Sequence, residues 1–234
     1  NSFCTLLAIR DSTMSSDNAP AEADAVEARR PAVTVAPRYW TVAPADHVRL
    51  VEQLGDIHAE EFSREFGSAI NRHSLHSLIG KVQMKAGCIF CGDLLLRGDI
   101  ATGSIDLGKC VVLGESVLVR PPVHRISDSD LRMVAVTVGE HVIVGQRTIV
   151  EASRIGSCVI IESDCVLGPE CELHHGVWLK SGSVVPKGAK LMPFGVYEGH
   201  PAKLIGQLNP DAGLFEVRDL VLDVIRRSGL LSYE

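Results

Sequence analysis

Residues 138–192 decide the fold, and they read VGEHVIVGQRTIVEASRIGSCVIIESDCVLGPECELHHGVWLKSGSVVPKGAKLM. Aliphatic residues recur along this stretch every six positions, with one step of five. These anchors are Val138, Val144, Val150, Ile155, Ile161, Leu167, Leu173, Leu179, Val185 and Leu191. A helix repeats every 3.6 residues and a strand every two, so neither explains the spacing. A hexapeptide period is typical of a parallel β-helix.

The geometry of such a coil explains the residue types in each hexad. Each hexad gives one short strand and a corner, and three hexads close a coil whose neighbours stack about 4.8 Å apart. Glycine follows the anchor at 139, 145, 156 and 168, where it eases the turn. We therefore predict an all-β solenoid, a left-handed parallel β-helix of hexapeptide repeats, in which the anchors stack in three buried columns. Left-handed winding is an exception to the usual crossover rule.

The repeat extends upstream and is interrupted once. Leu107, Leu113 and Val119 keep the spacing, whereas residues 79–100 fit two phases, Ile89/Leu95 or Phe90/Leu96. Residues 120–137 contain two prolines and a polar run, which predicts a loop that leaves the coil. The predicted β-helix spans residues 79–208.

Helices are expected on both sides of the repeat. Residues 44–66 carry an apolar stripe after Pro44, within a helical extension over 44–78. Residues 209–230 carry another stripe, with Asn209 and Pro210 as start signals and Gly229 as the stop, inside a C-terminal segment 209–234. Residues 1–43 have the composition of a disordered tail, and we expect translation to start at Met14.

Composition excludes several classes of function. The net charge of −6 argues against nucleic acid as the main partner, and no apolar run is long enough for a membrane span. The seven cysteines are an odd number, which favours a reducing, cytoplasmic setting over a disulfide scaffold. Cys88 and Cys91 form a single C-x-x-C, and a zinc ribbon needs a second pair. We expect no cofactor and no metal.

Several stretches resemble known hexapeptide proteins. Arg97-Gly98-Asp99 and the ending Gly199-His200-Pro201-Ala202-Lys203 are similar to gamma-class carbonic anhydrases and to hexapeptide proteins in general. A closer resemblance, from about residue 79 to 225, is to the dynactin subunit 5 family of the pointed-end complex. It rests on Leu96–Asp99, Val119-Arg120-Pro121-Pro122, Val138–Val142, Ala152–Ser157 and Pro193–Pro201.

The resemblance implies a non-catalytic scaffold subunit, associated with the cytoskeleton, that supports dynein and its cargo adaptors. The implied partners are the sister β-helix subunit, the actin-related protein at the pointed end, and dynactin subunit 4. Within the matching stretches, we expect Arg120, Pro121, Pro122, Phe194, Tyr197 and His200 to contact partners.

Enzymatic alternatives depend on other residues. A gamma-class carbonic anhydrase holds zinc with three histidines, but the matching positions carry Val119, Gln146 and Glu151. A hexapeptide acyltransferase needs a general base, for which the candidates are His141, His174 and His175. No nucleophile can be identified beside any of the three histidines. An enzyme is therefore the alternative to the scaffold function.

Overall fold

The structure is a computed structural model that describes residues 39–55, 62–65, 67–72, 77–98, 104–125 and 131–231. All of these residues lie in the unit that runs from Ala36 to Glu234. The predicted tail and start site at residues 1–38, and residues 56–61 with His58, lie outside the described residues.

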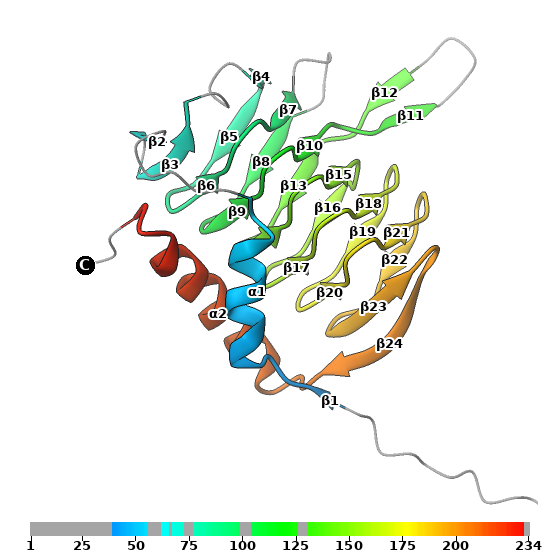
Figure 1. Cartoon of the computed structure of the whole chain (residues 1–234). Helices are drawn as coiled ribbons and strands as arrows, with labels where there is room; N and C mark the ends of the chain where they lie inside the picture. The colour runs from blue at the N-terminus through cyan, green and yellow to red at the C-terminus, as the bar shows by residue number, and fades with distance from the viewer. Residues whose placement is uncertain are drawn as a thin grey trace, which may run out of the picture. The chain divides into compact units, whose positions relative to one another are not determined.

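Three sheets form the flat faces of the solenoid, here called faces A, B and C, and their strands are parallel except for the pairs β2–β3 and β23–β24 at the two ends of face A (Figure 1). Among the described residues, face A has ten strands in the order β1-β24-β23-β20-β17-β14-β9-β6-β3-β2, and faces B and C have six each. The chain visits the faces in rotation, so each strand pairs with the strand one coil earlier and one coil later. This is the predicted fold class, which the structure confirms.

The strand bounds on face A are β1 (Tyr39–Trp40), β2 (Phe62–Glu65), β3 (Ser68–Asn71), β6 (Ile89–Phe90), β9 (Val111–Leu113), β14 (Val142–Val144), β17 (Ile160–Ile161), β20 (Trp178–Leu179), β23 (Gly195–Gly199) and β24 (Ala202–Leu208). Face B contains β4 (Leu78–Gly80), β7 (Leu95–Gly98), β10 (Leu118–Val119), β15 (Ile149–Val150), β18 (Val166–Leu167) and β21 (Val184–Val185). Face C contains β5 (Val82–Met84), β8 (Ile105–Leu107), β13 (Val136–Val138), β16 (Arg154–Ile155), β19 (Glu172–Leu173) and β22 (Lys190–Leu191).

The ten predicted anchors are all buried, each at 5% exposure or less. Strand pairing stacks them in register in the expected columns, because side chains at paired positions point the same way. The columns are Val138–Ile155–Leu173–Leu191, Val144–Ile161–Leu179 and Val150–Leu167–Val185. No helix occurs between residues 138 and 190, a stretch that the structure describes completely. Upstream, Phe90 and Leu96 join the columns through Leu113 and Val119, which settles the ambiguous phase.

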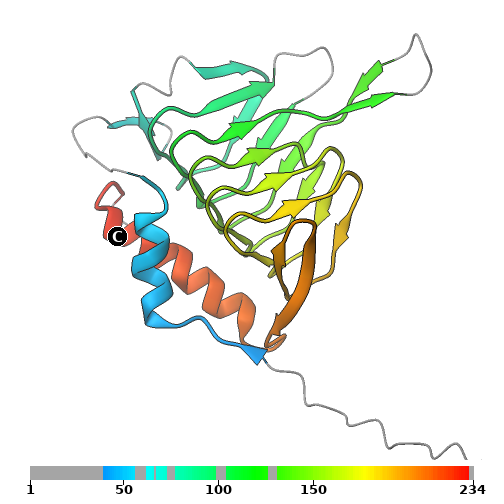
Figure 2. The same cartoon turned by 45° about the vertical axis from the view of Figure 1, so that its right-hand side comes forward.

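The predicted loop at 120–137 contains an antiparallel hairpin, β11 (Val123–Arg125) with β12 (Leu131–Met133). The hairpin leaves the solenoid after β10 and returns in β13 (Figures 1 and 2). The chain rejoins the coil at Val136, one residue before the predicted end of the loop, because Val136 pairs with Ile105 and is buried.

The N-terminal helix is shorter than predicted. Helix α1 spans Pro44–Glu52, and Gly55 lies in the left-handed region at φ 94°. Phe62, which fitted the helical stripe, is instead buried in β2, so the prediction of a helix over 44–66 is wrong in its second half. The predicted tail also ends too late, because β1 pairs with β24. Strands β2 and β3 join face A although they precede residue 79, the expected start of the β-helix.

Helix α2 spans Gly213–Ser228 and packs with α1 on the outside of face A (Figure 2). It begins three residues later than Pro210 predicted. The side chain of Asn209 does not cap it but accepts a hydrogen bond from the Asp211 N–H at 3.0 Å. The predicted stop is confirmed, since Gly229 ends the helix at φ 66°.

Candidate partner-binding surfaces

The corner between faces B and C carries Arg120, Pro121 and Pro122, three of the residues expected to contact partners. They follow β10 and line a groove of about 310 Å³ at the base of the hairpin. The other lining residues are Arg97, Val123, Met133, Glu151, Pro169 and Lys187. Three prolines and a methionine beside charged groups make this groove rigid and partly apolar.

Ion pairs connect this corner from coil to coil. The Arg120 guanidinium binds the carboxylate of Glu151, one coil further on. His124 of the hairpin lies 2.9 Å from a Glu170 oxygen, which joins the hairpin to the corner. The hairpin therefore contacts the solenoid through His124 and Glu170, and at its base the Val134 N–H donates to the Pro122 carbonyl at 3.0 Å.

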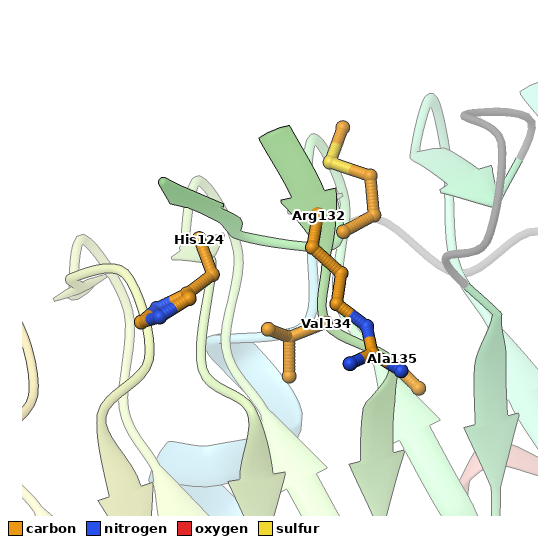
Figure 3. Close-up of a pocket in the computed structure, with 5 residues that line it drawn as sticks. His124, Arg132, Val134 and Ala135 are labelled. Carbon is orange, nitrogen blue, oxygen red and sulfur yellow. The ribbon is translucent and has the colours of Figure 1, made fainter. Parts of the chain in front are cut away.

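A second pocket, of about 530 Å³, lies under the hairpin between His124, Arg132, Met133, Val134 and Ala135 (Figure 3). His124 and Arg132 are opposite each other in the hairpin, and both side chains project toward the pocket. Arg132 is exposed. The pocket thus places the Arg132 guanidinium beside an apolar floor.

Phe194, Tyr197 and His200 lie on the last coil, on the face A side, and do not meet the groove residues. His200 is exposed, whereas Phe194 is half-buried beside the helices. Tyr197 is only 6% exposed, and its hydroxyl accepts a hydrogen bond from the Met192 N–H at 2.8 Å. Tyr197 therefore stabilises the last coil, and only Phe194 and His200 can contact a partner directly.

Glu162 is the centre of a charged network that the sequence reading missed. Its carboxylate is 3% exposed and accepts hydrogen bonds from Trp178 Nε1 at 2.8 Å and from Arg49 at 2.9 Å. Lys180 Nζ lies 3.2 Å away, and the Ser181 N–H and hydroxyl donate at 3.1 and 2.9 Å. This network ties α1 to the solenoid through Arg49.

Opposing effects act on the pKa values of Glu162 and Lys180, the two main partners in this network. Burial alone would raise the pKa of Glu162, but Lys180, Ser181, Trp178 and Arg49 outweigh it and hold the pKa below its usual value. The pKa of Lys180 is also lowered, because its burial, with the nearby Arg49, outweighs the attraction of Glu162 and Asp46. Lys180 lies over the Trp178 ring at 3.6 Å and faces Trp40 at 5.0 Å. One sequence signal was available: Glu162 follows an anchor, at a position where four other hexads carry glycine, and Lys180 follows another anchor.

Comparison with known proteins settles the family. The sequence model of the dynactin subunit 5 family matches residues 52–228, which is most of the chain. This chain belongs to the dynactin subunit 5 family.

One curated member of the family, "Dynactin subunit 5" from Dictyostelium discoideum, is 26% identical over 91 residues. That match covers 39% of this chain and 44% of the relative, so the chain spans less than half of the relative's length. Among solved structures, a hexapeptide transferase family protein from Anaplasma phagocytophilum has a TM-score of 0.58 at 17% identity. The match covers 70% of this chain and 89% of the transferase family protein, and it shows the shared fold alone.

The positions that hold zinc in gamma-class carbonic anhydrases have other roles in this member of the dynactin subunit 5 family. Val119 is buried in the inner column, and Glu151 is bound by Arg120. The Gln146 N–H donates to the Gln53 carbonyl. Among the described residues, no three His, Cys, Asp or Glu side chains are grouped to hold a metal ion.

The candidate catalytic histidines lie at corners between faces C and A, with His141 after β13 and with His174 and His175 after β19. His141 occupies a corner at φ 57°, and burial, with help from Arg218 and Lys109, lowers its pKa. His175 accepts a hydrogen bond from the Ser157 N–H at 3.1 Å, so its ring braces the neighbouring coil.

The thiols of Cys88 and Cys91 are buried, which raises their pKa values to about 11 and about 12. These two cysteines pack as small apolar side chains. In the described part of the chain, no helix is both long and apolar enough to cross a bilayer.

Proposed function

We propose that this chain is a non-catalytic scaffold subunit of the dynactin pointed-end complex that supports attachment of dynein cargo adaptors. The observation that carries the proposal is the family match over residues 52–228. The zinc positions support it, because valine cannot bind a metal and Glu151 is already engaged by Arg120. The proposed location is the cytoplasm, in association with the cytoskeleton.

The proposed partners are the sister β-helix subunit, the pointed-end actin-related protein, dynactin subunit 4 and the cargo adaptors. Solenoids present rigid faces and end strands to partners. The groove formed by Arg120, Pro121 and Pro122 is one proposed contact, since it joins apolar walls to positive charge. Phe194 and His200 on the last coil are the other.

Light scattering on the purified chain tests the assembly. We expect a monomer or a poorly behaved oligomer when the chain is alone, and a stable heterodimer when it is co-expressed with the sister subunit. A sharp, concentration-independent homotrimer would contradict the proposal, because hexapeptide enzymes build their sites between three copies.

A charge reversal tests the hairpin. Arg132→Glu changes the guanidinium of the second pocket, and Arg154→Glu on face C is the matched control because both side chains are exposed. We expect the first variant to weaken assembly with the four proposed partners in a reconstituted pointed-end complex, and the second to leave it unchanged. Equal effects of the two would remove the hairpin from the proposed contact surface.

A further inference from the structure

The outward-facing side chains differ among the three faces, although the inner columns are alike. On face A, the outward column consists of Ala69, Ile89, Val112, Ile143, Ile160, Trp178 and Val196, all at 1% exposure or less. Helices α1 and α2 cover this column. The outward column is therefore apolar on the face that the chain's own two helices cover.

On face C, the outward column is polar. It consists of Gln83, Asp106, Thr137, Arg154, Glu172 and Lys190, stacked in register. Neighbouring rungs form ion pairs, such as Lys190 with Glu172 at 3.0 Å. Face C shows that the coil folds with a polar outward column where water is the neighbour.

Face B departs from this rule. Its outward column is a ladder of five aliphatic side chains, Leu95, Leu118, Ile149, Val166 and Val184. Ile149 is 36% exposed and the other four are half-buried, since each rung shields the next. None of the five belongs to a hydrophobic cluster of the described residues. Both helices lie on the opposite side of the solenoid from β15, β18 and β21 (Figure 1).

We propose that the face B ladder is a docking surface for an amphipathic α-helix of another protein. An apolar strip rimmed by polar residues marks an interaction site. Five rungs at about 4.8 Å extend over about 19 Å, the length of a helix of about 13 residues at 1.5 Å per residue. Side chains three or four apart on a helix repeat every 5–6 Å, close to the rung spacing. The proposal does not depend on the family assignment.

Charge at the rims specifies one flank of the partner helix. Where the face B strands begin, the described rim carries Asp93, Glu115 and the pair Arg147–Asp164, bonded at 2.7 and 2.8 Å. With three carboxylates against one guanidinium, this rim has an excess of negative charge. A basic flank of the helix fits there.

At the opposite rim, where the strands end, the described charges are paired: Arg120 binds Glu151, Lys187 lies 3.7 Å from Glu170, and Arg97 also has a partner. The occupant is thus an aliphatic-striped helix with lysine or arginine along the edge that meets the negative rim. This asymmetry sets the direction in which the helix runs.

A designed peptide tests the proposal with the full chain. The probe is a labelled 16-residue helix with a leucine stripe and lysines along one edge, and the control peptide has the same composition scrambled. Fluorescence polarisation measures the dissociation constant. We expect saturable binding of the striped peptide only. Absence of saturable binding up to about 1 mM, where specific affinity becomes negligible, would overturn the proposal.

Substitutions locate the binding. Ile149→Lys places a charge in the middle of the ladder, Ile149→Thr keeps the β-branched shape, and Thr137→Lys is the control at the same hexad position on face C. We expect Ile149→Lys to weaken the peptide at least about tenfold and Ile149→Thr to weaken it by less, because apolar area is lost in both. Thr137→Lys should change nothing. Equal binding to all four proteins would overturn the assignment to face B.

Self-association is a separate outcome. Light scattering over a range of concentrations shows whether the ladder is covered by a second copy. A dimer that Ile149→Thr dissociates and Thr137→Lys preserves would overturn the helical partner in favour of self-association.

Discussion

Removing the Glu162 carboxylate tests whether the charged network stabilises the part of the solenoid that faces α1. In Glu162→Ala, the Lys180 ammonium at 12% exposure loses its ion-pair partner, and three neutral donors lose their acceptor. Removing one partner of a buried pair costs about 3–5 kcal/mol. Arg49 adds little, because its side chain is 42% exposed and water replaces the lost contact.

The conservative variant separates charge from shape. Glu162→Gln keeps one acceptor oxygen and loses the charge, so we expect about 2 kcal/mol of destabilisation, the worth of one hydrogen bond to a charged group. In a domain of this size each kcal/mol lowers Tm by about 2–4 °C, so Glu162→Ala should melt about 6–20 °C lower. Differential scanning calorimetry and urea unfolding measure both.

A matched control exists one face away. Glu172 pairs with Lys190 at 3.0 Å with the same eighteen-residue separation as Glu162 and Lys180, but its side chain is 31% exposed and that of Lys190 is 64% exposed. We expect Glu172→Ala to leave Tm nearly unchanged, because exposed pairs contribute little. The reasoning fails if Glu162→Ala melts within about 2 °C of wild type, less than about 1 kcal/mol in a domain of this size, or if Glu172→Ala loses as much.

The pH dependence has a definite sign. Because the folded pKa of Glu162 is lowered, its carboxylate stabilises the fold above the unfolded pKa of about 4.3 and loses that contribution as pH falls through the folded pKa. We therefore expect the stability gap between wild type and Glu162→Gln to be full at pH 6 and to shrink below about pH 4.

Three further predictions concern the solenoid itself. Ile161→Asp should unfold the chain, since an unpaired buried carboxylate costs several kcal/mol; an unchanged Tm would contradict the inner column. Gly145→Ala should cost about 1–3 kcal/mol by overpacking, because its Cβ would lie 2.6 Å from the Ser163 nitrogen, and chemical denaturation measures this. Purified, untagged protein should hold no stoichiometric zinc and hydrate no carbon dioxide; zinc by elemental analysis that disappears in Glu151→Ala would show the opposite.

The inner columns were predictable because one physical constraint repeats. Each hexad must place one aliphatic side chain inside the coil, so Val138 to Leu191 carry the period in the sequence itself. Local signals were weaker where two periods compete. Phe62 fits a helical stripe and a strand equally well, and only its pairing with Asn71 in the sheet decides between them. That pairing joins residues on either side of a turn, which no stripe records.

The candidate site was predictable only in part. Arg120, Pro121 and Pro122 do line a groove, but Glu162 draws its donors from positions up to 113 residues away. The outward columns could have been predicted from the sequence, because the residues that precede every third anchor lie on the same face. Reading Ile149, Val166 and Val184 in that way gives the apolar face directly.

The order of the elements explains why the faces are unequal. Strand β1 enters along the edge of β24, and α2 follows β24 directly, so the chain delivers both helices to face A. Faces B and C are left with the same coil geometry and no helix of the described chain above them. Since face C is stable with a polar column, folding does not require aliphatic side chains at Leu118 or Ile149. Exposed apolar strips carry a risk of aggregation, so their presence on face B points to a use outside the folded chain.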